Sequence, residues 1–321
     1  MSLAELSSRA IIGWFYKKLN ASDGMGWIQA ISNYFTSDQD SEEYKWIGQS
    51  PVMREWVGSR QAKGFTTNGI TIENKHFEAT IDIPVKHLRR DKTGQIKVRI
   101  NELANRTNSH WALLLSDLIK RGESNVCYDG AYFFDENHEE GKSGKQSNKI
   151  TFDLNKAGVN GEVGTPDVPT EAALRQAILR GIQQIISFKD DQGEPLNENA
   201  QKFLVMVPTN LWFIAKACVA VPLSVGGATN PVKVLSDLDI AVASNPRLNW
   251  TDKIIIFRTD SDVKALIRQE EEAVQIKAKA ENSEYEFDND AHQYGVDTWR
   301  NAGYGYWQNS VLVTLTKVEK A

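Results

Sequence analysis

A long run of apolar residues at helical spacing is the feature that most constrains this chain. Between about residues 95 and 121, apolar side chains recur every three or four positions, at Ile96, Ile100, Leu103, Trp111, Leu114, Leu115 and Leu118. The run ends in Lys120, Arg121 and Gly122, an order typical of a helix end. About 26 residues at 1.5 Å each predict a rod of about 39 Å, which is long for a helix of an ordinary enzyme domain.

Before this helix, the sequence pattern indicates extended chain. Phe77, Ala79, Ile81 and Ile83 alternate with polar residues, which predicts a half-buried strand ending at Pro84. The preceding segment "GSRQAKGFTTNG" is rich in Gly, Thr and Asn. We therefore expect a long β-hairpin over about 44–83, with its tip near 63–69. Such a hairpin has little core of its own and should lie against something else.

The first 43 residues read as an arm that forms no core. Helix-like intervals separate Leu3, Leu6, Ala10, Ile11, Trp14 and Leu19, and Ser2 is a candidate N-cap. A short apolar segment, "WIQAISNYF", and the polar run "TSDQDSEE" follow.

The sequence after the long helix predicts a compact α/β unit followed by long strands. Thr170 should cap a helix, 209–221 should form another, and strands are expected at 203–208, 237–244 and 253–259. From about 263 onward we expect two long antiparallel strands, 263–287 and 294–317, the second with Trp307, Val311, Val313 and Leu315 on one face.

Composition excludes several classes of protein. Hydrophobic content of 41% and nine tryptophans indicate a globular fold. A net charge of −5 argues against a dedicated nucleic-acid binder. Two cysteines, Cys127 and Cys218, are too few for a disulfide framework and fit a reducing cytoplasm. No apolar run approaches the roughly 20 residues that span a bilayer, and the N-terminus lacks the features of a signal peptide.

Candidate chemical sites are weak. "GKSGK" at 141–145 lacks the first glycine of a phosphate loop. Two groups could be imagined as metal ligands for a hydrolase, although neither has an established ligand spacing: Cys127, Asp129, Asp135 and His138, and Asp288, Asp290 and His292. His76, His87 and His110 are scattered singly, and 269–273, "QEEEA", reads as an exposed charged face. We expect no catalytic, cofactor or metal site and no enzyme.

Four landmarks in order resemble a known family. They are "YKWIGQSPVMREWVGSR" from residue 44, "ITIENKHFEATIDI" from 70, "CYDGAYFFDENH" from 127 and "YGVDTWRNAGYGYWQ" from 294. Together they resemble the major head subunit of Mu-like phages. This resemblance implies an α+β chain with the tailed-phage major capsid protein fold.

The resemblance also implies a division of the chain. An N-terminal arm would cover 1–43, an extended β-hairpin called the E-loop 44–83, and a peripheral domain with a spine helix 84–121. An axial α/β domain would cover 122–250, and C-terminal strands over 251–321 would complete the peripheral sheet.

The function that the resemblance implies is structural. The chain would assemble as hexamers and pentamers into the icosahedral head of a virion, inside the host bacterial cytoplasm, and would enclose double-stranded DNA without reading its sequence. Separate scaffold, portal and decoration proteins would be its partners, and no membrane would be involved. We expect subunit contacts at Trp46, Arg54, Glu55, Trp56, Arg60, Lys63, Arg89 and Arg90. A metal-dependent hydrolase and a DNA-binding module are the alternatives.

Overall fold

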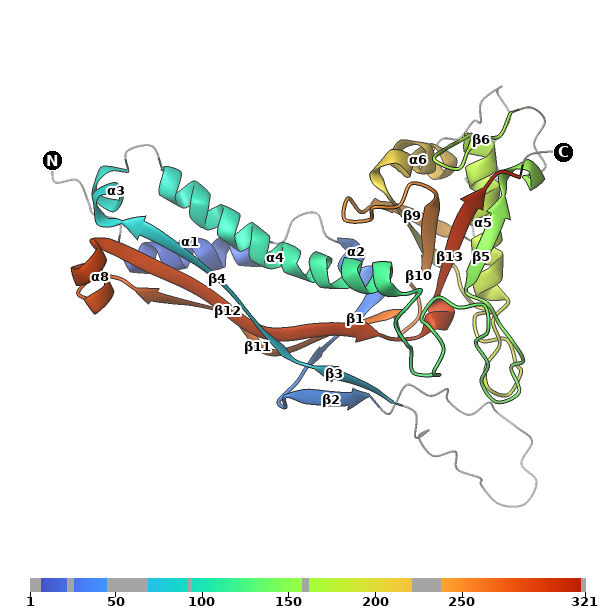
Figure 1. Cartoon of the computed structure of the whole chain (residues 1–321), viewed down its shortest axis with the longest axis horizontal. Helices are drawn as coiled ribbons and strands as arrows, with labels where there is room; N and C mark the ends of the chain where they lie inside the picture. Colours follow the sequence, from blue (N-terminus) through green and yellow to red (C-terminus); the bar gives the residue numbers. More distant parts are fainter. Residues whose placement is uncertain are drawn as a thin grey trace, which may run out of the picture.

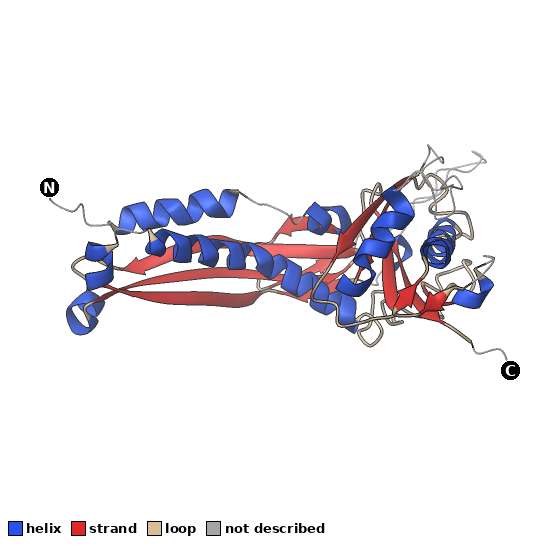
Figure 2. Ribbon diagram, turned by 90° about the horizontal axis from the view of Figure 1, so that it is seen from above, coloured by secondary structure: helices blue, strands red, loops and turns tan. Residues whose placement is uncertain are grey.

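The computed structural model describes residues 7–21, 26–44, 69–91, 94–157, 162–220 and 238–318. Its shape is elongated, with a long sheet and a long helix that lead into a compact unit at one end (Figures 1 and 2). No helix in these ranges is both long enough and apolar enough to cross a membrane.

The long sheet has the strand order β1-β11-β12-β4. These strands are β1 (Ser32–Thr36), β4 (Lys75–Pro84), β11 (Leu266–Lys279) and β12 (Ala291–Tyr304). β1 runs parallel to β11, and the other neighbours are antiparallel. β11 and β12 have 14 residues each, a length of about 46 Å at 3.3 Å per residue. Their register shifts between Glu270 and Gln275, as at a β-bulge.

Helix α4 (Gln95–Arg121) runs along this sheet, and α1 (Ser8–Asn20) packs beside α4 (Figure 2). The carboxylate of Asp91 accepts the backbone N–H groups of Gln95 and Ile96 at 3.0 and 3.1 Å, so it satisfies two donors at the helix start. Ile96 and Ile100 pack in a core with α1 and the sheet. The predicted long helix is confirmed.

The compact unit contains a five-stranded sheet of order β5-β13-β10-β8-β9. Its elements are β5 (Lys149–Asp153), α5 (Glu171–Ile186), β8 (Lys202–Val207), α6 (Trp212–Ala220), β9 (Asp239–Ser244), β10 (Lys253–Arg258) and β13 (Ser310–Thr316). Ile254 to Phe257 of the central β10 are fully buried, which shows that both faces of the sheet are covered. Thr170 caps α5 as predicted, its hydroxyl accepting from Ala173 N–H.

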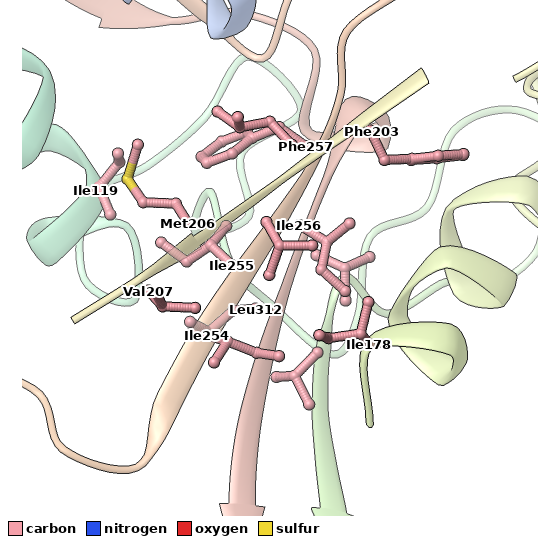
Figure 3. Close-up of a cluster of buried hydrophobic side chains, with 14 of the residues drawn as sticks. Ile119, Ile178, Phe203, Met206, Val207, Ile254, Ile255, Ile256, Phe257 and Leu312 are labelled. Carbon is pink, nitrogen blue, oxygen red and sulfur yellow. The ribbon is translucent and has the colours of Figure 1, made fainter. Parts of the chain in front are cut away.

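The second half of α4 belongs to this compact core. Ala112, Leu115 and Ile119 are buried in it. Figure 3 shows Ile119 near Met206 of β8, in the core to which Ile178 of α5 also contributes. One helix therefore has its two ends in two different cores.

The two strands that flank 45–69 pair as expected at the base of a hairpin. β2 (Ser41–Tyr44) is antiparallel to β3 (Ile70–Glu73), with Tyr44 opposite Ile70. Residues 63–68 of the expected tip lie outside the described residues. The chain then enters β4, so 75–84 belongs to the long sheet and not to a projecting hairpin.

Shorter elements complete the described chain. They are α2 (Gly26–Ile31), α3 (Val85–Arg90), η1 (Leu154–Lys156), β6 (Gly164–Thr165), β7 (Val168–Pro169), η2 (Thr209–Leu211), α8 (Glu284–Asn289) and η3 (Trp307–Asn309).

The prediction that the first 43 residues form no core is wrong. Ile11 and Phe15 of α1 and Ile31 of α2 are fully buried, and β1 is a strand of the long sheet. Ser7 is the N-cap of α1, which starts at Ser8, and the predicted cap Ser2 lies outside the described residues. Ile11 and Phe15 share their core with residues of β4, α4 and β12 that come about 68 to 285 positions later in the chain, and no local pattern can reveal such partners.

The C-terminal strands are also divided differently from the prediction. Residues 284–289 form the helix α8 because Ser283 caps it, and 294–317 contains two strands separated by η3. β10 and β13 pair within the five-stranded sheet, so the prediction that all C-terminal strands complete the long sheet is wrong for these two. Trp307 lies in η3 and not on a strand face.

Gly305, between β12 and β13, has no room for a side chain, so we expect its substitution to destabilise the fold. A Cβ on Gly305 would lie 2.5 Å from the carbonyl oxygen of Lys264, and Gly305 N–H is fixed by a 2.8 Å hydrogen bond to Ala265. Gly305→Ala should lower the free energy of unfolding by about 1–3 kcal/mol through overpacking. Gly295→Ala is the control, since its Cβ would meet only Thr80 Oγ1 at 3.4 Å. Equal urea midpoints for the two variants would contradict this.

Candidate functional site

The residues expected at subunit contacts fall into two groups. Trp46, Arg54, Glu55, Trp56, Arg60 and Lys63 lie outside the described residues. Arg89 and Arg90 lie on α3, at the end of the long sheet that is farthest from the compact unit (Figure 1). Val85 and Leu88 of this helix are buried, which turns the two arginines outward. Arg89 and Arg90 are therefore exposed at one tip of the molecule.

The base of the hairpin is held by a buried amide. Gln269 of β11 is fully buried, its Oε1 accepts the Tyr44 hydroxyl at 2.8 Å, and its Nε2 donates to the carbonyl of Ile72 at 3.1 Å. Asn301 donates to the Glu73 carbonyl at 2.7 Å. These bonds fix β2 and β3 against the long sheet. The prediction that 269–273 is an exposed charged face is therefore wrong at Gln269.

A polar cluster lies between α4 and the long sheet. Arg300 of β12 is buried, and its guanidinium lies 4.7 Å from the ring centre of Trp111. Its Nε donates to His110 Nδ1 at 3.1 Å and its Nη2 to the Thr107 carbonyl at 3.0 Å. Glu270 Oε1 lies 3.7 Å from Nη1. Arg300 thus joins the middle of α4 to the two central strands.

Other members of the cluster bring in β1. The Tyr34 hydroxyl donates to Glu270 Oε2 at 2.5 Å, and Arg268 Nε donates to Ser32 Oγ at 2.8 Å. Arg268 also lies 5.3 Å from the ring centre of Tyr34. Burial, followed by the hydrogen bond to Glu270, raises the pKa of Tyr34 to about 12. The cluster therefore ties β1, β11, β12 and α4 together.

The electrostatics of the cluster keep one histidine neutral. Burial, followed by the positive charges of Arg300 and Arg247, lowers the pKa of His110 to about 4. Burial also lowers the pKa of Arg300 to about 10, so its guanidinium stays charged at neutral pH. His110 Nδ1 accepts from Arg300, which places the proton of the neutral ring on Nε2.

The first candidate metal group forms a structural pair instead. His138 is fully buried, with Nδ1 2.5 Å from Asp129 Oδ2 and Nε2 3.1 Å from Asn148 Oδ1. Its ring stacks on Trp307 at 3.9 Å. Both ring nitrogens of His138 therefore already have a hydrogen-bond partner within the protein. Asp135 accepts backbone N–H groups within its own turn.

The remaining candidates are also structural. His292 is buried and bonded to Glu286 at 3.1 Å, while Asp290 ends α8 in a left-handed conformation. Burial raises the pKa of Cys127 well above its ordinary value, which disfavours a thiolate. Gly141 begins a tight turn against Asp191 and follows no strand. Within the described ranges, no three His, Cys, Asp or Glu side chains are grouped to hold a metal ion.

Similar solved structures identify the fold. The procapsid of bacteriophage JBD30 aligns with a TM-score of 0.54 at 21% identity, over 98% of this chain and 77% of that chain. The virus-like particle of Pyrococcus furiosus gives 0.51 at 11% identity, over 95% and 98%. The long helix, long sheet and compact α/β unit therefore define a capsid protein fold of the tailed-phage class, as the sequence predicted.

Sequence relatives narrow the class. A family model described as Mu-like prophage major head subunit gpT matches residues 14–158 and 240–318, more than half of the chain. The major capsid protein of Escherichia phage Mu is 32% identical over 108 residues, which is 34% of this chain and 35% of that protein, so the alignment spans about a third of each. The chain belongs to the Mu-like prophage major head subunit gpT family.

The ion pair between Glu270 and Arg300 is buried, so we expect its loss to lower the free energy of unfolding more than the loss of an exposed ion pair. Glu270→Ala should cost about 3 kcal/mol of unfolding free energy, because it leaves the buried Arg300 without its carboxylate partner. Lys277→Ala breaks an exposed pair with Asp297 and should cost at most about 1 kcal/mol. Replacing Glu270 and Arg300 together by Met should recover much of the loss. Equal losses in urea unfolding for the two single variants would contradict a role for the cluster.

The neutral His110 predicts a pH dependence. Because its pKa of about 4 lies below the ordinary value of 6.5, the unfolded chain takes up a proton first as the pH falls. The contribution of His110 to the free energy of unfolding should therefore be fully present above about pH 6.5 and decline toward pH 4. His110→Gln keeps an acceptor for Arg300 and should show a smaller decline in urea unfolding between pH 7 and 4.5. An unchanged pH profile would contradict this.

Proposed function

We propose that this chain is the major capsid protein of a Mu-like bacteriophage or prophage. It assembles as hexamers and pentamers into the icosahedral head of the virion, which encloses double-stranded DNA. Assembly takes place in the host bacterial cytoplasm. Separate scaffold, portal and decoration proteins are its partners.

The observation that carries this proposal is the single helix with its ends in two cores. Ile100 packs in the core of the long sheet and Ile119 in that of the compact unit, so the two units are linked by one continuous rod. A shell subunit has to keep its shape while contacts repeat on all sides. A rod-linked, elongated body supports that role better than a closed catalytic domain.

The proposed division of the chain follows from this. The long sheet with α4 would be the peripheral domain, and the compact unit the axial domain, which then includes β10 and β13 as well as residues 122–250. The segment 45–68, attached to the anchored base β2 and β3, would be the E-loop that reaches a neighbouring subunit. Trp46, Arg54, Glu55, Trp56, Arg60 and Lys63 remain the proposed contacts there.

The charge of the chain supports a container and not a DNA reader. The net charge is −5, and Arg175, Arg258 and Arg300 are buried and unavailable to phosphate. A lining that bound phosphates tightly would oppose the movement of DNA during packaging and release.

Assembly is the test of this proposal. The chain co-expressed with the scaffold protein of its own prophage should yield shells, tubes or capsomers in electron micrographs. Trp56→Ala and Glu55→Arg should each lower the yield of closed shells about tenfold or more, since each 1.4 kcal/mol lost per contact is tenfold in association. Gly295→Ala serves as a control of folding. A wild-type chain that stays monomeric under all assembly conditions would overturn the proposal.

A further inference from the structure

The short helix α8 displays an aromatic side chain to solvent. Phe287 is 91% exposed. The turn around it is well bonded: Ser283 Oγ accepts from Glu286 N–H at 3.2 Å, and Glu286 Oε1 contacts the buried His292 at 3.1 Å. A phenylalanine held in water by an ordered turn forgoes the free energy that burial of its ring would supply. Such a residue is typical of a contact anchor.

Negative charges lie on both sides of this ring in the sequence. Glu284 and Asp288 are exposed, and neither has an ion-pair partner among the residues that the structure describes. Glu286, by contrast, is engaged with His292. The surface of α8 is therefore one apolar ring with two uncompensated carboxylates.

A hollow of the opposite charge lies beside α3. It has a volume of about 430 Å³, an apolar part and a basic part, formed by Ile83, Pro84 and Ile96 and by His87, Arg90 and Arg99. Arg90 and Arg99 are exposed and have no ion-pair partner within the described ranges. Apolar lining with a basic rim is complementary to an aromatic ring between two carboxylates.

The two acidic residues of the hollow are already engaged. Asp91 accepts the first N–H groups of α4, and Asp82 accepts the hydroxyl of Tyr285. The bond between Asp82 and Tyr285 also shows that α8 and the hollow are neighbours at one tip, where Figure 1 places α3 and α8 together. Phe287 nevertheless does not enter the hollow of its own chain, because it is exposed.

We propose that Phe287 of one subunit inserts into the hollow beside α3 of a second copy, with Glu284 and Asp288 facing Arg90 and Arg99. This inference rests on the function proposed above and gives Arg90 a partner. The contact is heterologous, since knob and hollow are different surfaces, and copies related by rotation about the tip would close into a ring.

The contact is small and belongs in an assembly. One phenylalanine buries about 150–250 Å², far below the roughly 1,200 Å² of a stable two-chain interface. The contact of Phe287 should therefore hold two copies together only where other subunit contacts of the shell also bind them. A cross-link measured in assembled shells is the appropriate readout.

Two chains, each with one added cysteine, test the contact without removing Phe287. Asp288→Cys lies next to Phe287, Gln95→Cys lies in the hollow, and native Cys127 and Cys218 are buried. Each chain is co-expressed with the scaffold protein, alone or mixed, and treated with a short bis-maleimide. Mixed shells should give at least tenfold more cross-linked dimer than either chain alone. Lys216→Cys on α6, mixed with Gln95→Cys, is the matched control and should give none.

Side-chain replacement then tests the ring itself. Phe287→Ala in the Asp288→Cys chain should lower the cross-linked fraction about tenfold, while Phe287→Leu should keep most of it. Shells without cross-links, or Asp288→Cys chains that cross-link to one another equally well, would overturn this contact and leave the capsid function standing. Failure of the wild-type chain to assemble at all would overturn both.

Discussion

Helix α4 buries one half of its apolar stripe in each of two cores, and the rest of the structure depends on this. Ile96 and Ile100 pack with α1 and the long sheet, whereas Leu115 and Ile119 pack under the five-stranded sheet. Neither core could move relative to the other without exposing part of the stripe, at about 25 cal/mol for each Å². The elongated shape that suits a shell subunit is therefore a consequence of one continuous helix.

The polar cluster at Arg300 fixes the position of that helix on the sheet. Apolar packing alone would let α4 slide along the sheet, because similar aliphatic side chains recur along the helix and can replace one another. A buried guanidinium that must meet Glu270, His110 and the Thr107 carbonyl together allows one register. Gln269 does the same for the hairpin base. Specific hydrogen bonds thus place elements that hydrophobic burial has already brought together.

Sequence reasoning succeeded where a pattern is local and long. The period of α4 and the Thr170 cap of α5 are local, and both predictions are confirmed. The sequence did not predict burial that depends on remote partners. Phe15, Gln269 and Arg300 are buried because strands or helices more than 180 positions away in the chain cover them. Most of the expected contact residues lie outside the described part, and Phe287 had no signal in the sequence, since exposure is a property of the fold.

The sequence by itself determined the long helix α4, the capped start of α5, the landmark motifs and, through these motifs, the family of this chain. Only the tertiary structure decided that β12 and β13 belong to different sheets, although fewer than ten residues separate them. The physical reason is that a strand pattern specifies which faces are apolar but not which neighbour covers them. That choice falls to close approaches such as Gly305 against Lys264, which involve the whole packed molecule.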